Sequence, residues 1–200
     1  MAELLAFLGV AVVVIVTPGQ DTALTVRNTL AGGRAGGTRT AAGVVCGQAV
    51  WALAASAGVA ALLVASEPAF VALKLAGAAY LAYLGGHALL AAVRRRPQEW
   101  HEPRAHGGNE LRQGLLSNLG NPKMAVFFSS LLPQFADSFA GLLALGLLFC
   151  ALTLAWLSAY ALAVARAGDV LRRPRVRRAI DAVTGTALLA LGVRLAVSDR

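Results

Sequence analysis

The sequence predicts an all-α membrane protein with six transmembrane helices, arranged as two inverted repeats of three helices each. Two observations carry the membrane assignment. Of 200 residues, 58% are apolar and only 14% are charged, and the mean hydropathy is +0.66. A soluble domain has about 45–50% apolar and about 25% charged residues. The apolar residues are also gathered into long runs, which are typical of helices that cross a bilayer.

The first span is short unless it is read as two pieces. Leu4–Val16 is an apolar run that would rise only about 20 Å as a helix, against a hydrocarbon core of about 30 Å. Helix-compatible sequence resumes after Thr17-Pro18-Gly19-Gln20-Asp21 and continues to about Ala31. We therefore expect one helix that is broken near the membrane interior.

Five further apolar runs complete the predicted topology. They cover 41–65, 69–93, 114–133, 140–165 and 179–197, and the run at 114–133 is interrupted at 118–123. A soluble domain of this size lacks the interior to bury six such helices on all sides. We treat 1–200 as a single transmembrane domain, with repeat halves at 1–93 and 113–200 joined by a cytoplasmic linker at 94–112.

The distribution of arginine predicts the orientation. Sixteen of the eighteen cationic residues are arginine, and fourteen of these lie in the connections after spans one, three and five. Positively charged connections stay on the cytoplasmic side, so both termini are expected outside. The same distribution argues against a nucleic-acid partner, because no basic face with interleaved aromatic residues is evident.

Few patterns in the chain favour catalysis. Cys46 and Cys150 lie in apolar runs without metal-ligand spacing, so we expect no metal and no cofactor. The chain also lacks HExxH and Gly-x-Ser-x-Gly motifs, which argues against an intramembrane enzyme. A transporter is the favoured class. A channel for small polar solutes or ions of the same architecture and a non-transporting scaffold remain alternatives.

An internal repeat relates the two halves. Each half consists of three spans, an odd number, so the second half enters the membrane from the opposite side. The two spans that are interrupted by proline are the strongest evidence for this repeat. The matched positions are Pro18 with Pro122, Trp51 with Trp156, and Leu84-Gly85 with Leu191-Gly192, which are 104, 105 and 107 residues apart.

Each break is expected to begin a new helix inside the bilayer. Thr17 suits an N-cap, Pro18 the first helical position, and Gln20 the third helical position, where a capping box has Glu or Gln. Asn121 and Pro122 suit the same first two roles at the second break. The new helix N-termini would expose N–H groups and partial positive charge, which attract an anionic group such as a carboxylate.

Two charged residues lie at the predicted breaks. Asp21 and Lys123 are each ten residues from the cytoplasmic end of their span, a depth of about 15 Å in a helix. An isolated charge at this depth costs at least about 2.5–3.5 kcal/mol, so it should pair or line a polar cavity. We expect the two charges to approach each other across a central cavity.

The second span adds one polar residue and one packing motif. Gln48 could line the cavity or bond to a neighbouring helix, and Gly43 and Gly47 form a GxxxG pattern that predicts close helix packing. The predicted substrate-binding residues are Thr17, Pro18, Gly19, Asp21, Gln48, Asn118, Asn121, Pro122 and Lys123.

Three stretches resemble the LysE/RhtB family of bacterial amino-acid exporters. They are Thr17-Pro18-Gly19-Gln20-Asp21, the segment 74–81, and Asn121-Pro122-Lys123 followed by Phe127-Phe128 and Leu132-Pro133-Gln134-Phe135. The similarity covers nearly the whole chain in the same order. Gln20 stands where the family usually has a second proline, which changes the local geometry of the break.

The resemblance implies a six-helix exporter of amino acids or close derivatives, driven by the proton gradient across the bacterial inner membrane. Its partners would be the lipid bilayer and a small zwitterionic substrate. The substrate carboxylate is then expected near Lys123 and the half-helix N-termini, and its ammonium near Asp21, which could also carry the counter-moving proton. Which amino acid is exported, and whether the protein is a homo-oligomer, are left open.

Overall fold

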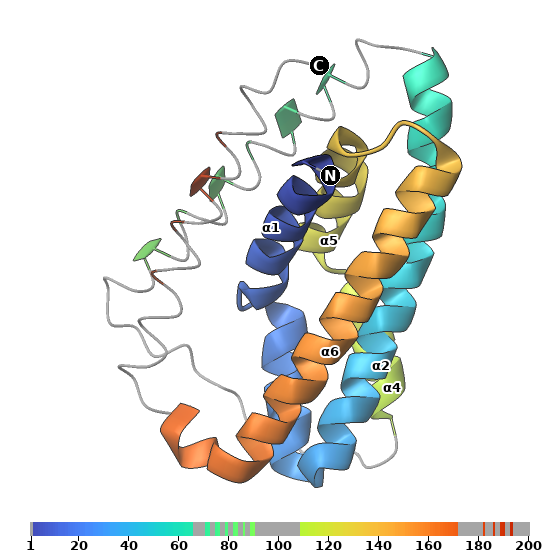
Figure 1. The fold of residues 1–200 in the computed structure, drawn as a ribbon. Helices are drawn as coiled ribbons and strands as arrows, with labels where there is room; N and C mark the ends of the chain where they lie inside the picture. The colour runs from blue at the N-terminus through green and yellow to red at the C-terminus, as the bar shows by residue number, and fades with distance from the viewer. Residues whose placement is uncertain are drawn as a thin grey trace.

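The computed structural model describes residues 2–65 and 109–171, and isolated helical positions within 71–90 and 182–193. The described part contains helices but no strand, which confirms the all-helical class for these residues (Figure 1). Most of the third span, the linker and the sixth span lies outside the described residues, so six spans and the inverted repeat stay predictions. The described elements are α1 (Ala2–Val16), α2 (Gln20–Ala65), α4 (Glu110–Leu119), α5 (Pro122–Val126), a π-helical turn (Phe127–Leu131), a 3₁₀ turn (Leu132–Gln134) and α6 (Phe139–Leu171).

Helix α2 is a hairpin of two helical legs. The backbone leaves helical geometry at Gly32 and Gly33, and Gly33 has φ of 63° and ψ of −164°, a conformation that is essentially confined to glycine. Beyond this turn the second leg runs back beside the first, and the Asn28 side chain donates to the Thr40 hydroxyl. The first leg covers the residues predicted to complete span one, and the second leg covers those of the predicted span two.

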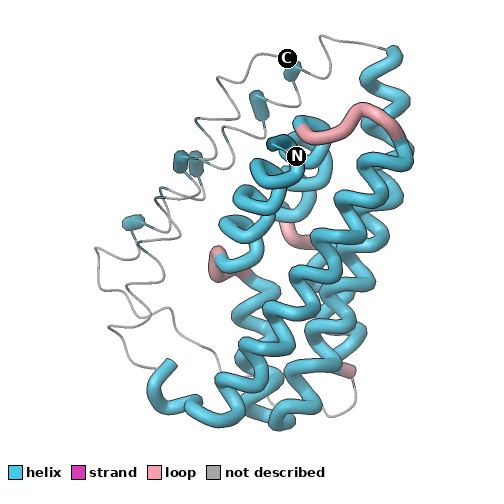
Figure 2. The backbone as a smooth tube through the Cα atoms, viewed as in Figure 1, coloured by secondary structure: helices cyan, strands magenta, loops and turns pink. Residues whose placement is uncertain are grey.

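Both predicted helix breaks are present. Helix α1 ends at Val16 and α2 begins at Gln20, while α4 ends at Leu119 and α5 begins at Pro122. The two breaks appear as short loop segments near mid-height of the helical bundle in Figure 2. They interrupt the bundle in its interior, where a continuous transmembrane helix would have no ends.

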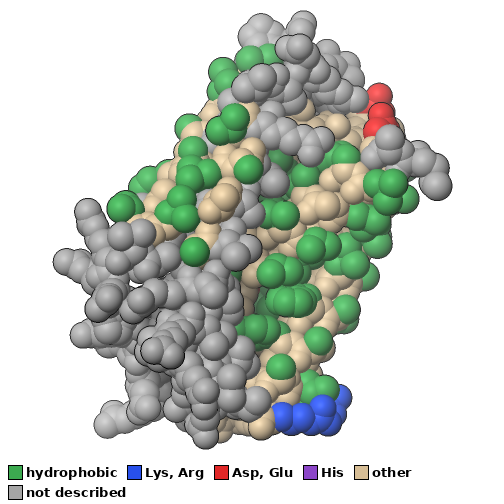
Figure 3. All heavy atoms as spheres, turned by 60° about the vertical axis from the view of Figure 1, so that its left-hand side comes forward, with side chains coloured by type: hydrophobic (Ala, Val, Ile, Leu, Met, Phe, Trp, Pro, Cys, Tyr) green, Lys and Arg blue, Asp and Glu red, His purple; other side chains and the backbone are tan. Residues whose placement is uncertain are grey.

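The surface of the described helices suits a lipid environment. Two helical segments, 20–58 and 139–166, are long and apolar enough to cross a membrane. Large hydrophobic side chains such as Leu5, Leu53 and Leu147 are exposed. In Figure 3 the visible Lys and Arg side chains gather at one end of the molecule and acidic side chains at the other, with hydrophobic side chains between them.

Small residues let the helices approach closely around the breaks. A Cβ at Gly43 would overlap the Leu111 carbonyl oxygen, and a Cβ at Gly47 would lie 2.9 Å from Asn118 atoms. The predicted close packing of the GxxxG pattern is thus confirmed, and α4 is its partner. A Cβ at Gly146 would lie 2.7 Å from the Cβ of Ala52, so α6 also packs closely on α2.

Candidate functional site

At the first break the Thr17 side chain bonds back to α1 and does not form a capping box with the next helix. The Thr17 hydroxyl donates backward to the Val13 carbonyl at 2.6 Å, and the first bond of the next helix runs from Ala23 N–H to the Gly19 carbonyl. The predicted N-cap role of Thr17 is therefore wrong. The reason is local: a threonine hydroxyl can bond the carbonyl four residues before it, and Thr17 uses its hydroxyl in this way.

Lys123 binds the carbonyl end of α1, where Val14 and Thr17 are buried. Its ammonium donates to the Val14 carbonyl at 3.1 Å and to the Thr17 carbonyl at 3.0 Å. In a continuous helix the Val14 carbonyl would accept from the N–H of residue 18, but Pro18 has none. Lys123 supplies the missing donor, and its positive charge faces the negative end of the helix dipole.

The second break follows the prediction. Asn121 is the N-cap of α5, its side-chain oxygen accepts from the Lys123 backbone N–H at 3.0 Å, and Pro122 occupies the first turn. Pro122 is itself exposed. Its side chain is apolar, and its role is to fix the backbone of this turn. The cap directs the chain so that the Lys123 side chain extends toward the first break.

Asp21 is buried and held by three donors from the second break. Ser117 Oγ donates to one carboxylate oxygen at 2.7 Å, and the side-chain amides of Asn118 and Asn121 donate to the other at 2.8 Å each. Asp21 also lies in the first turn of α2, where the helix dipole favours a negative charge. Ser117 is a contact that the sequence analysis missed.

Two further bonds join the second break to α2. The Gln20 side chain donates to the Ser117 carbonyl, and the Trp51 indole donates to the Asn118 carbonyl at 3.3 Å. Both acceptors lie in the last turn of α4, where helix carbonyls lack intrahelical partners. The residue that departs from the family pattern, Gln20, therefore closes the end of α4 from the start of α2.

Together these contacts form a reciprocal tie: Asp21 binds side chains at the second break, and Lys123 binds backbone at the first. The two charges do not form a direct ion pair, because the Lys123 ammonium is bonded to the backbone carbonyls of Val14 and Thr17. Gly19 completes the contact, because a Cβ there would lie 3.3 Å from Lys123 Nζ. Both charges are thus buried in one polar cluster. The central cavity expected between them and their role in binding a substrate stay predictions.

Four buried polar side-chain atoms lack hydrogen-bond partners in the described part of the chain. Gln48 is buried and donates only to the sulfur of Met124 at 3.6 Å, and its oxygen is unpaired. Such groups are rare in protein interiors, and each calls for an explanation such as a bound water or ligand. The unpaired atoms are Gln48 Oε1, Asn118 Oδ1, Thr153 Oγ1 and Trp156 Nε1.

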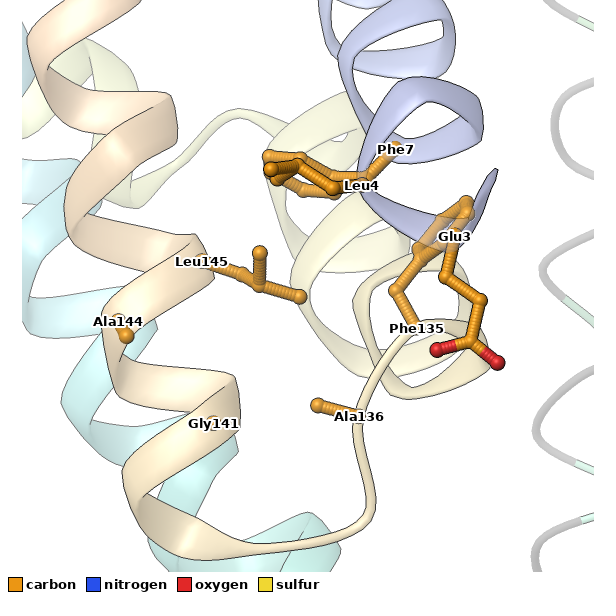
Figure 4. A pocket seen from close by; sticks show the side chains of 8 residues that line it. All are labelled: Glu3, Leu4, Phe7, Phe135, Ala136, Gly141, Ala144 and Leu145. Atoms are coloured by element: carbon orange, nitrogen blue, oxygen red, sulfur yellow. The ribbon is translucent and has the colours of Figure 1, made fainter. Parts of the chain in front are cut away.

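A separate cavity of about 310 Å³ lies at the opposite end of α1 from the first break (Figure 4). It is formed by the start of α1, the loop after the 3₁₀ turn and the start of α6. Its lining is largely apolar, including Phe7, Phe135 and Leu145, with Glu3 as the charged group. None of the predicted site residues lines it, and no cluster of three metal-ligating side chains occurs among the described residues.

The model of the LysE type translocator family matches residues 12–199, which include both breaks and the whole polar cluster. The chain belongs to the LysE type translocator family. This membership confirms the resemblance, and it identifies the protein as a membrane translocator. The family membership points away from an enzyme.

Curated relatives of this translocator include membrane proteins from several bacteria. A leucine efflux protein of Salmonella typhimurium is 32% identical over 127 residues, which cover 64% of this chain and 60% of the relative. Uncharacterized membrane proteins of Bacillus subtilis and Pseudomonas aeruginosa are 26% and 35% identical over 99% and 94% of this chain, and over 100% and 91% of their own lengths. No solved structure matches the chain.

Proposed function

We propose that this translocator is a secondary transporter that exports amino acids or close derivatives across the bacterial inner membrane in exchange for protons. The observation that carries the proposal is the burial of Asp21 and Lys123 where two broken helices meet. An amino acid carries one negative and one positive group, so it complements this pair of charges. The relatives named leucine efflux protein support an amino-acid cargo.

Each charge keeps hydrogen-bonding capacity for a substrate. A carboxylate has about four acceptor positions, and at Asp21 three of them are filled by donors from the protein. An ammonium has three N–H donors, and two of those of Lys123 bond to backbone carbonyls. A substrate ammonium would donate to the remaining acceptor position of Asp21. A substrate carboxylate would accept from the remaining N–H of Lys123, or draw Lys123 away from the α1 carbonyls.

Release of Lys123 from α1 would loosen the contact between the two breaks. If the two halves are inverted repeats, this contact is where one half rocks against the other during alternating access. Asp21 would carry the counter-moving proton. Protonation removes the charge that binds the substrate ammonium, so proton binding and substrate binding would compete at one carboxylate.

The proposed topology has six spans, with both termini outside and the arginine-rich turns in the cytoplasm. Arg34 and Arg166 are exposed in the second leg of α2 and near the end of α6, and Asp137 is exposed in the turn before α6. Replacing Cys46 and Cys150 with alanine and adding one cysteine tests this arrangement. A cysteine at Arg34 should react with an impermeant maleimide only in everted vesicles, and one at Asp137 only in intact cells.

An export assay tests the function. Cells with and without the protein are fed dipeptides of each of the twenty amino acids, and the medium is compared by mass spectrometry. We expect one or a few amino acids to accumulate faster with the wild-type protein and not with Lys123→Met. In everted vesicles, uptake of those amino acids should require an imposed proton gradient. Uptake that ignores the gradient would indicate a channel, and no accumulation in any arm would refute the exporter.

A further inference from the structure

The second helix of each repeat half carries the same short pattern at equivalent positions. In α2 it is Gln48 followed three residues later by Trp51, and in α6 it is Thr153 followed three residues later by Trp156. Gln48 and Thr153 are 105 residues apart, as are Trp51 and Trp156. This is the offset that relates the two halves. In each helix this spacing places the polar side chain and the indole on the same face.

The two patterns differ in how they are used. The Trp51 indole donates to the Asn118 carbonyl, and the Gln48 amide donates to Met124. The Thr153 hydroxyl and the Trp156 indole nitrogen are buried but have no partner among the described residues. Thr153 itself is only 4% exposed. Two donors hidden from solvent without acceptors are costly unless something else binds them.

The stacking of two phenylalanines places Thr153 level with Lys123. The ring of Phe127, in the π-helical turn that continues α5, stacks on the ring of Phe149 in α6 with centroids 4.1 Å apart. The two helices run in opposite directions, as Figure 1 shows. Lys123 precedes Phe127 by four residues and Thr153 follows Phe149 by four. Because the helices are antiparallel, both residues lie about one helical turn from the stacked rings, toward the same end of the bundle.

The contact between α6 and α2 gives the same level for Gln48. Gly146 of α6 packs against Ala52 of the antiparallel second leg of α2. Gln48 precedes Ala52 by four residues and Thr153 follows Gly146 by seven, so the two lie within about 5 Å of the same height in the bundle. The unpaired donors of α6 and the unpaired acceptors of Gln48 and Asn118 therefore belong to one buried layer with the reciprocal tie.

We propose that Thr153 and Trp156 are substrate-binding residues that, with Lys123, bind the carboxylate of the exported amino acid. This inference rests on the proposed function and adds an orientation for the substrate. The donors with capacity left over among the described residues come from α5 and α6, namely the third N–H of Lys123, Thr153 and Trp156. Groups that accept come from α2 and α4, namely Asp21, Gln48 Oε1 and Asn118 Oδ1. The substrate carboxylate therefore faces α6 and its ammonium faces α2.

A free carboxylate is then a requirement of the site, and the α-carboxamide of the same amino acid is the matched probe. The full-length protein is reconstituted in proteoliposomes, and initial rates are measured for each of the twenty L-amino acids. For the amino acid transported fastest by the wild type, KM is compared with that of its α-carboxamide. The variants are Thr153→Val, which removes the hydroxyl donor and keeps the shape of the side chain, and Trp156→Phe, which removes the indole donor and keeps an aromatic ring.

We expect each variant to raise KM for the amino acid by about tenfold or more, because a hydrogen bond to a charged group is lost, and to change KM for the amide little. Thr153→Ser keeps the hydroxyl and should keep the wild-type ratio of the two KM values. The matched control is Thr29→Val, because the Thr29 hydroxyl is satisfied within α2 by the Thr25 carbonyl at 2.7 Å. It should leave the ratio unchanged.

The failures of the two proposals are distinguishable. If the wild type transports none of the twenty amino acids, the proposed function fails, and this inference with it. If the wild type transports one but Thr153→Val and Trp156→Phe leave the ratio of KM values unchanged, the function stands and the inference is overturned. Equal losses for acid and amide would also overturn it, because the two side chains would then act on the protein and not on the carboxylate.

Discussion

The ammonium of Lys123 donates a hydrogen bond to the backbone carbonyl of Val14, 109 residues earlier in the chain, at 3.1 Å. This bond joins the restart of one broken helix to the end of another. It exists because Pro18 removes the backbone donor that would otherwise satisfy Val14. The first break and the buried lysine are therefore one structural unit, and a change to either should be felt at the other.

Removing the ammonium should impair both transport and stability. In Lys123→Met the Val14 and Thr17 carbonyls lose their shared donor inside the protein, and Asp21 becomes the one charge in the cluster. We expect export to be abolished and the free energy of unfolding to fall by about 1–3 kcal/mol. Thermal unfolding in detergent measures the second effect. Arg166→Met, which removes an exposed cation of α6, is the control and should behave as wild type. Export by Lys123→Met at the wild-type rate would show that the lysine has no part in transport.

Restoring the missing backbone donor should disable the first break. In Pro18→Ala the new N–H can bond the Val14 carbonyl, so α1 can extend and compete with Lys123 for its acceptor. We expect export to fall while the protein stays folded, because a helical bond replaces the one that is lost. Pro122→Ala is the matched control: Pro122 lies at the start of α5, where a helix N–H has no intrahelical acceptor. A loss of export that is as large for Pro122→Ala as for Pro18→Ala would count against this account.

Neutralising Asp21 should be more damaging than removing one of its donors. In Asp21→Asn an amide NH₂ replaces one acceptor oxygen and faces donors that have no other partner. We expect export to be lost and the proton gradient no longer to drive uptake into everted vesicles. In Ser117→Ala two amide donors to the carboxylate remain, so the cost should be about 1 kcal/mol of stability with export retained. Gradient-driven uptake by Asp21→Asn would exclude this carboxylate as the proton carrier.

The sequence located the breaks because proline, glycine and asparagine act on the backbone of their own neighbours. The positions of Pro18, Asn121 and Pro122 were enough to predict where the helices stop and restart. The donors and acceptors across the breaks were harder, because they depend on the packing of residues about 100 positions apart. The Lys123 ammonium, for example, meets backbone carbonyls and not Asp21. The N-cap prediction for Thr17 fails for a local reason, because its hydroxyl bonds the Val13 carbonyl four residues earlier.

Thr153 and Trp156 show a different limit of sequence reasoning. A threonine and a tryptophan within an apolar helix are usually satisfied or interfacial, so neither residue attracts attention by type. The repeat did contain the signal, because the offset that matches Trp51 with Trp156 also matches Gln48 with Thr153. What the sequence could not show is that Trp51 and Gln48 donate to other described residues, whereas Thr153 and Trp156 have no partner among them.

Close packing of α2 on α4 gives a prediction that concerns stability alone. In Gly43→Ala the added methyl group would meet the Leu111 carbonyl, a backbone atom that cannot rotate away. The two helices would have to separate, and the overpacking should cost about 1–3 kcal/mol. Gly9→Ala in α1 is the matched control, because a Cβ there meets nothing within 4 Å. Alanine is favoured over glycine in a helix by up to about 1 kcal/mol, so Gly9→Ala should be neutral or stabilising. Thermal unfolding of both variants in one detergent compares them directly, and equal melting temperatures would show that α2 and α4 are not in this close contact.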